Sequence, residues 1–241
     1  MDRYLMKVGA GMTFSSGFTR RFPDIWRCIA LTAFLTLLSF GAFPVAAKES
    51  AKSHERVMVF GDSLSAAYGI SPKDGWVTLM GAKLQSQGVA VVNASISGET
   101  TLGGLNRIKG DLARLRPTIV ILALGANDGL RGLPNANTRK NLEAIIVASR
   151  SASARVVLVG VQIPPNYGLE YSQQFREIYA DLAGKYKLPL VPFLLEGFAD
   201  KLELFQADRL HPTAAAQARI VDNVTPALSQ AIAKPSTPAR R

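Results

Sequence analysis

From Val57 onward, short runs of apolar and β-branched residues alternate with longer amphipathic stretches. This alternation is typical of repeated βα units, in which parallel strands form a sheet and the connecting helices cover its faces. Two of the runs are almost continuously apolar, as expected for strands buried on both sides. The pattern predicts five strands, at residues 57–60, 89–94, 118–124, 156–161 and 190–192.

The amphipathic stretches have the spacing of helices that bury one face. Pro212 suits the first turn of the last helix because a residue there needs no N–H partner. Right-handed crossovers then predict an α/β fold, a three-layer α/β/α sandwich around a five-stranded parallel sheet. The expected helices lie near residues 75–87, 103–114, 138–151, 170–186 and 212–231.

Small and polar residues follow the first four predicted strands. Ligands of such folds bind at the carboxyl ends of the strands, so these segments should meet at one edge of the sheet. They are Gly61-Asp62-Ser63, Ser95-Ile96-Ser97-Gly98, Gly125-Ala126-Asn127-Asp128 and Pro164-Pro165-Asn166-Tyr167-Gly168.

Residues 1–47 have the features of a secretory signal peptide: basic residues, an apolar run over 28–43 and the small-residue site Val45-Ala46-Ala47. We therefore expect cleavage after Ala47 and a periplasmic or secreted protein. A retained anchor is an alternative, although the run is shorter than the roughly 20 residues of a spanning helix. Met6 and Met12 are alternative start sites. Arg20-Arg21 resembles a twin-arginine signal, but Pro23 and Asp24 follow where apolar residues are expected.

The remaining chain is long enough for one α/β domain, residues 48–233, with a basic tail at 234–241 that we expect to be disordered. The apolar content of 48% and charged content of 19% are ordinary for a globular protein. The single cysteine, Cys28, lies in the signal segment, so a processed chain has no disulfide, thiolate metal site or cysteine nucleophile. The net charge of +10 is dispersed, which favours weak contact with anionic membranes or acidic substrates over nucleic-acid binding.

The chain has two histidines, His54 and His211. His54 lies in the polar lead-in and is expected to be an exposed residue. Asp208 precedes His211 by three residues, and its carboxylate can accept a bond from Nδ1–H while Nε2 faces a cleft, as a catalytic base requires. The alternative is a helix N-terminus capped by Asp208 beside a surface histidine.

Ser63 is the candidate nucleophile, because it stands just past a buried strand where Gly61 permits a tight turn. The alternatives are an ordinary strand-to-helix turn or a backbone cradle for phosphate, as in flavin-binding proteins. Gly98 and Asn127 could supply the hydrogen-bond donors that an oxyanion needs, although each alone could be a turn residue or a loop cap. Together with Ser63, Asp208 and His211 they predict acyl transfer.

These segments also resemble the signature motifs of a known protein family. Gly61-Asp62-Ser63-Leu64, Gly98, Gly125-Ala126-Asn127-Asp128 and Asp208-Arg209-Leu210-His211 resemble the four signature blocks of the SGNH, or GDSL, hydrolases, in order and spacing. The segments around Asn93, Arg131 and Tyr167 are similar to one branch, the bacterial multifunctional enzymes described as acyl-CoA thioesterase I, lysophospholipase and arylesterase. The similarity covers residues 57–224.

The resemblance implies a flavodoxin-like fold of the SGNH type, a Ser63-His211-Asp208 triad, and an oxyanion hole from the N–H groups of Ser63 and Gly98 with the Asn127 side chain. It implies cleavage of carboxylic esters and acyl thioesters, including aryl esters, acyl-CoA and lysophospholipids. No metal or organic cofactor, a periplasmic location and a monomer are also expected, with Asp62, Asn93 and Asp128 as supporting residues.

The resemblance further implies that residues 129–134 close over acyl substrates. The residues expected to contact substrate are Leu130, Leu133, Pro134, Pro165 and Tyr167. Three alanines at 214–216 depart from the pattern and leave the specificity of the cleft rim open. The rival from another class is a periplasmic module of flavodoxin-like fold that binds phosphate or flavin, which gives Asp208 and His211 no role.

Overall fold

In the computed structural model, residues 55–234 are described, and they form an α/β domain. Residues 1–47, which we expect to be a signal peptide, lie outside the described residues, as do His54 and, apart from Lys234, the basic tail. The strands are β1 (Arg56–Gly61), β2 (Ala90–Asn93), β3 (Ile119–Ala123), β4 (Arg155–Val159) and β5 (Leu190–Val191). All five pair in parallel in the order β2-β1-β3-β4-β5.

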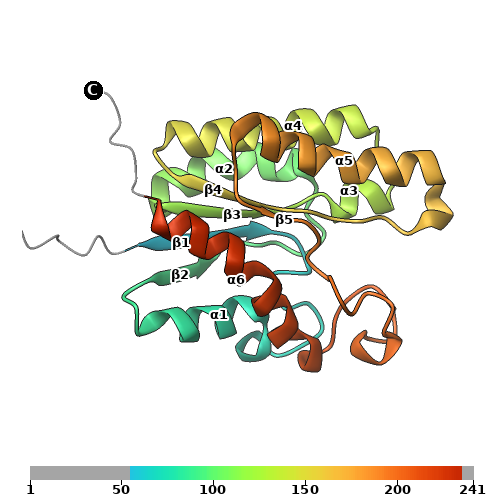
Figure 1. The fold of residues 1–241 in the computed structure, drawn as a ribbon, viewed down its shortest axis with the longest axis horizontal. Coiled ribbons are helices and arrows are strands. Elements are labelled where there is room, and N and C mark those ends of the chain that lie inside the picture. Colours follow the sequence, from blue (N-terminus) through green and yellow to red (C-terminus); the bar gives the residue numbers. More distant parts are fainter. Residues whose placement is uncertain (1–54, 235–241) are drawn as a thin grey trace, which may run out of the picture. The chain divides into compact units, whose positions relative to one another are not determined.

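Helices cover both faces of this sheet (Figure 1). Alternate strand residues such as Val57 and Ile121 pack with α1 and α6, while Met58 and Leu122 pack with the helices of the opposite face. This division follows from the two-residue period of a strand. The predicted three-layer fold is therefore confirmed. The helices are α1 (Trp76–Gln85), α2 (Thr101–Leu115), α3 (Ala126–Leu130), α4 (Asn135–Ser151), α5 (Leu169–Tyr186) and α6 (Gln217–Ala233).

Two expectations about helices were wrong. The segment after β3, expected as a loop, contains the short helix α3. The last helix begins at Gln217 rather than Pro212, because Pro212 forms an antiparallel bridge with Phe205 and a 3-10 turn, Ala214–Ala216, comes before the helix.

Gln217 joins the C-terminal part of the domain to α1. Its side-chain Oε1 accepts a hydrogen bond from the Trp76 backbone N–H at 3.0 Å, and its Nε2 donates to the Thr213 carbonyl at 3.2 Å. Gln217 is 3% exposed, so these bonds satisfy a side chain that would otherwise be costly to bury. They also join the segment that precedes α6 to the start of α1.

No helix within residues 55–234 combines the length and the apolar character needed to cross a bilayer.

Candidate active site

The strand order reverses beside β1, since β2 lies on one side of it and β3 to β5 follow on the other. Open parallel sheets place ligands at such a switch point, outside the carboxyl ends of the strands. Ser63 lies two residues past β1, and Asn127 lies in α3 just past β3. The two strands are hydrogen-bonded neighbours, so these two segments meet at the switch point.

Ser63, His211 and Asp208 form one hydrogen-bonded chain. The distance from Ser63 Oγ to His211 Nε2 is 2.9 Å, and that from His211 Nδ1 to Asp208 Oδ2 is 2.7 Å. An ionised carboxylate only accepts hydrogen bonds, so Nδ1 carries the proton and Nε2 is free to accept from the serine hydroxyl. The arrangement can transfer the Ser63 proton to His211.

The Asp208 carboxylate is held in its ionised form. The backbone N–H groups of His211 and Leu210 donate to Oδ1 at 3.0 and 2.9 Å. These two bonds, with the imidazole of His211, lower the pKa of Asp208 from 3.8 to about 2. The carboxylate therefore remains a negative partner for an imidazolium at any pH well above 2.

The turn that carries His211 is closed by its own backbone. Gln206 N–H donates to the His211 carbonyl at 2.8 Å, and Arg209 N–H donates to the Gln206 carbonyl at 2.9 Å. Arg209 has a φ of +56°, a left-handed conformation that non-glycine residues seldom adopt. The Tyr68 ring lies 4.5 Å from the His211 ring, between centroids, and packs against the base from the side of β1.

Three potential oxyanion donors line one cavity with Ser63 and His211: two backbone N–H groups, of Ser63 and Gly98, and the Asn127 amide. Within residues 55–234, neither backbone N–H group donates to a protein acceptor. Gly98 has a φ of +79°, and no atom lies within 4 Å of the position that a Cβ would take, so its N–H is open to a ligand. Asn127 Nδ2 donates one hydrogen to the Glu99 carbonyl at 3.0 Å, which leaves its second hydrogen for an oxyanion.

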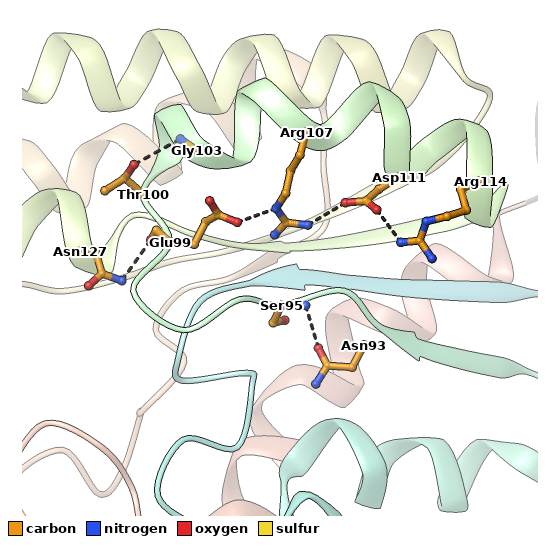
Figure 2. A network of polar contacts seen from close by, with 9 residues as sticks. All are labelled: Asn93, Ser95, Glu99, Thr100, Gly103, Arg107, Asp111, Arg114 and Asn127. Atoms are coloured by element: carbon orange, nitrogen blue, oxygen red, sulfur yellow. Dashed lines mark hydrogen bonds and ion pairs between the residues drawn. The ribbon is translucent and has the colours of Figure 1, made fainter.

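Buried polar side chains tie these segments together. Asp128 is 2% exposed, and its carboxylate accepts bonds from the Thr101 N–H at 2.8 Å and the Thr101 hydroxyl at 2.5 Å. Asn93 Nδ2 donates to the Ser65 carbonyl at 2.8 Å, while its Oδ1 accepts from Ser95 N–H (Figure 2). Asp128 thus joins α3 to α2, and Asn93 joins the loop after β2 to the turn of the serine.

Asp62, next to Ser63, is 1% exposed. Its Oδ1 accepts the Leu64 N–H at 3.1 Å, but its Oδ2 has no hydrogen-bond partner within the described part of the chain. Burial raises the pKa of Asp62 from 3.8 to about 7, and the negative charges of Asp128 and Glu99 add to this effect. The Asp62 carboxyl therefore holds a proton well above the usual pH range.

The cavity has a volume of about 650 Å³ and a largely apolar wall. Such an enclosure suits an apolar chain better than a charged ligand. Its apolar lining comes mainly from the segments that follow β4 and β5 and from the residues around the catalytic turn: Val161, Ile163, Phe193, Leu194, Leu195, Phe205 and Leu210.

Of the residues predicted to contact substrate, Leu130 lines this cavity. Leu133, Pro134 and Tyr167 are not part of its lining, and their contact with substrate stays a prediction. Leu133 N–H bonds to the Asp128 carbonyl and turns the chain towards α4, Pro134 caps α4, and Tyr167 is 40% exposed. Pro165 begins the 3-10 turn Pro165–Tyr167, and its side chain lies outside what the structure describes.

Sequence reasoning missed the wall formed by Phe193, Leu194 and Leu195. Three apolar residues after a short strand are also typical of a core segment, so periodicity alone does not distinguish a cavity wall from the hydrophobic core. It also missed Arg209, which is one of the residues that line the cavity. Within residues 55–234 there is no group of three or more acidic or histidine side chains that could hold a metal ion.

A doubly wound sheet with a hydrogen-bonded serine, histidine and aspartate at its switch point is an arrangement used by serine hydrolases. Residues 59–219 match the GDSL-like lipase/acylhydrolase family, and the chain belongs to this family of hydrolases. The predicted family and enzyme class are confirmed.

Curated relatives cover most of the domain. The chain is 44% identical to Esterase TesA of Pseudomonas aeruginosa over 72% of this chain and 88% of that protein. It is 40% identical to an arylesterase of Vibrio mimicus over 79% and 94% of the two chains. It is 37% identical to thioesterase 1/protease 1/lysophospholipase L1 of Escherichia coli K12 over 83% and 92%.

Solved structures agree with this assignment. A crystal structure of TesA, 44% identical, superposes with a TM-score of 0.71 over 73% of this chain and 99% of that chain. The psychrotrophic esterase EstA from Pseudoalteromonas sp., in a structure inhibited by monoethylphosphonate, is 38% identical with a TM-score of 0.70 over 73% and 97%. The chain is therefore similar to known esterases in both sequence and fold.

The raised pKa of Asp62 predicts a pH-dependent cost to stability. Between about pH 4 and pH 7 the unfolded chain releases the Asp62 proton while the folded chain retains it, so the folded state loses stability as the pH rises. Asp62→Asn keeps the acceptor for Leu64 N–H and removes the titration. We expect its stability relative to wild type to rise across this window by up to roughly 4 kcal/mol.

Urea unfolding of both proteins at pH 4, 6 and 8 measures this difference. Asp222→Asn is the matched control, because the Asp222 side chain is 73% exposed. A stability difference between Asp62→Asn and wild type that does not change with pH would contradict the assignment of a proton to Asp62.

Proposed function

We propose that the chain is an exported serine hydrolase that cleaves carboxylic ester and acyl-thioester bonds, with Ser63 as nucleophile, His211 as base and Asp208 as its orienting acid. The observation that carries the proposal is the unbroken chain of hydrogen bonds from Ser63 Oγ through His211 to Asp208. A module that binds phosphate or flavin would not require these hydrogen bonds between Ser63, His211 and Asp208. Membership of an acylhydrolase family also favours the enzyme.

In the acylation step, Ser63 Oγ attacks the substrate carbonyl while its proton passes to His211 Nε2. Asp208 stabilises the imidazolium that results. The carbonyl oxygen becomes an oxyanion and accepts hydrogen bonds from Ser63 N–H, Gly98 N–H and the free hydrogen of Asn127 Nδ2. Collapse of the tetrahedral intermediate breaks the bond to the leaving alcohol or thiol, which takes the proton from His211.

In the deacylation step, a water molecule takes the place of the leaving group. His211 Nε2 removes a proton from the water, the hydroxide attacks the acyl-Ser63 carbonyl, and the same donors stabilise the second oxyanion. Collapse returns the proton to Ser63 Oγ and releases a carboxylic acid. The cycle uses no redox step and restores every group of the protein.

Three lines support a substrate with an acyl chain. Relatives are named arylesterase and thioesterase 1/protease 1/lysophospholipase L1. The cavity beside Ser63 has an apolar wall, which suits a hydrocarbon chain. Serine chemistry treats oxygen esters and thioesters alike, so aryl esters, acyl-CoA and lysophospholipids are all proposed substrates.

The proposed setting is the periplasm or the exterior. It rests on the basic and apolar pattern of residues 1–47, with cleavage after Ala47. The proposed working form is a monomer, because the residues assigned to the reaction all come from one chain. Residues 1–47 carry five basic and two acidic residues, so the processed chain keeps a net charge of +7, which favours weak contact with anionic membrane surfaces, where lysophospholipids lie.

The nucleophile is tested with a fluorophosphonate probe, which labels an activated serine. We expect labelling of the wild type, none of Ser63→Ala, and continued labelling of Ser97→Ala, which alters another serine of the cavity lining. His211→Ala should lower ester turnover by at least about a thousandfold while circular dichroism shows an unchanged fold. Labelling that persists in Ser63→Ala, or full turnover in His211→Ala, would refute these assignments.

From the position of Arg209 we predict a preference for leaving groups that carry phosphate. Arg209 is an exposed residue of the cavity lining and makes no ion pair within residues 55–234, so its guanidinium is available to a phosphate-bearing leaving group. Arg209→Gln should lower kcat/KM for an acyl-CoA by roughly three- to tenfold and leave a neutral aryl ester almost unchanged. The effect should shrink at high salt.

Arg219→Gln is the matched control, since Arg219 is exposed on α6 and lies outside the cavity lining. Steady-state kinetics with an acyl-CoA and an aryl ester of equal chain length supply the comparison. Equal losses on the two substrates in Arg209→Gln would show that Arg209 acts on the fold of the turn rather than on the leaving group.

A further inference from the structure

A second group of charged side chains lies next to the oxyanion donors, outside the Ser63-His211-Asp208 chain (Figure 2). Arg107 of α2 binds Glu99 Oε2 through Nε at 2.5 Å and Asp111 Oδ2 through Nη1 at 2.7 Å. Asp111 in turn pairs with Arg114 at 2.6 Å. The four side chains alternate in charge along the first four turns of α2, beginning at the loop that contains Gly98.

The inner part of this network is shielded from solvent. The side chains of Arg107, Glu99 and Asp111 are 21%, 11% and 13% exposed, and Arg107 Cζ lies 3.9 Å from the centre of the Phe60 ring. A guanidinium stacked on an aromatic face and forked between two carboxylates has little freedom to move. Phe60 belongs to β1, three residues before Ser63, so Arg107 links the strand of the nucleophile to the loop of Gly98.

Glu99 is held at both ends. Its side chain binds Arg107, and its backbone carbonyl accepts the hydrogen bond from Asn127 Nδ2 at 3.0 Å. Glu99 also follows Gly98 directly. A shift of Glu99 therefore moves two of the three oxyanion donors together, the Gly98 N–H through the main chain and the Asn127 amide through its carbonyl partner.

The start of α2 does not need the Glu99–Arg107 pair as a cap. Thr100 Oγ1 accepts the Gly103 N–H at 3.2 Å, and Asp128 accepts the Thr101 N–H at 2.8 Å. These bonds already satisfy N–H groups of the first turn, which is the task of a helix cap. The partly buried Glu99–Arg107 pair is therefore not required to cap α2, and it lies behind the Gly98 and Asn127 donors.

We propose that Arg107 is a positioning residue of the oxyanion hole, which acts through Glu99 to set the distance between the Gly98 N–H and the Asn127 amide. The inference rests on the proposed function, because it assigns no chemistry to Arg107 itself. It predicts an effect on the transition state, where the oxyanion forms, and little effect on binding of the ground-state substrate.

The first test replaces Arg107 with Met, which keeps the length and packing of the side chain and removes its charge. With a neutral aryl ester, kcat and kcat/KM should fall equally, on the order of 10- to 100-fold, while KM stays within about a factor of three. Arg107→Lys keeps one ion pair but cannot bind both carboxylates at once. Its kcat should lie between those of Arg107→Met and the wild type. Arg114→Met is the control and should match the wild type, because Arg114 is on the same helix but 65% exposed, and among residues 55–234 its side chain bonds to Asp111 alone.

A second variant removes no charge. A methyl group added at Gly103 would lie 2.2 Å from Glu99 Oε1, so Gly103→Ala displaces the carboxylate from Arg107. Alanine also favours helix formation over glycine, so the folded state is not weakened by helix propensity. If Arg107→Met fails to fold, Gly103→Ala decides the question: a lower kcat with unchanged KM and thermal midpoint supports the proposal, and wild-type kcat overturns it.

A double-mutant cycle separates positioning from a general loss of structure. Asn127→Ala alone should lower kcat on the order of 100- to 1000-fold. If Arg107 acts through the donors, Arg107→Met should cost several-fold less in the Asn127→Ala background than in the wild type. Additive losses overturn the proposal.

Two outcomes separate this inference from the proposed function. A wild-type protein that hydrolyses no ester and takes no fluorophosphonate overturns the proposed function itself. An active wild type with unaffected Arg107 variants overturns only this inference.

Discussion

All five strands run in one direction, and the rest of the active site depends on this constraint. Parallel strands have their carboxyl ends at the same edge of the sheet, so the segments that follow the strands all begin at that edge. The reversal of order beside β1 then places the segments of Ser63 and Asn127 on adjacent strands, with the Gly98 loop on the other side of β1. Groups that are 64 residues apart in the chain therefore meet without long loops.

The donors at this edge are fixed by polar groups that are costly to bury. Asp128 is satisfied by Thr101, Asn127 by Glu99, and Glu99 by Arg107, so each group near the cleft orients the next. Networks of this kind hold a geometry when every member is bonded and weaken it when one is not. Among residues 55–234, Asp62 Oδ2 and Arg107 Nη2 are buried without a hydrogen-bond partner, and Asp62 avoids burying a charge by holding a proton.

The sequence was sufficient for the fold and for the residues that meet at the switch point. Continuous apolar runs identified the buried strands, and scarcity of histidine directed attention to His211. The sequence was insufficient where tertiary contacts override local preference. Helix α3 is five residues long and contains glycine and asparagine, and Pro212 is used in a bridge with Phe205 rather than in a helix. Phe193, Leu194 and Leu195 resemble core, and only their place beside the cavity distinguishes them.

The position of His211 near the C-terminal end of the domain has a consequence for biogenesis. Ser63, Gly98 and Asn127 all precede it by more than 80 residues, and the segment after His211 is joined to α1 through the bond between Gln217 and Trp76. A nascent chain thus carries its nucleophile and donors before it carries its base. The hydrogen bonds from Ser63 through His211 to Asp208 can form only after the segment of His211 has been made and lies beside the turn of Ser63.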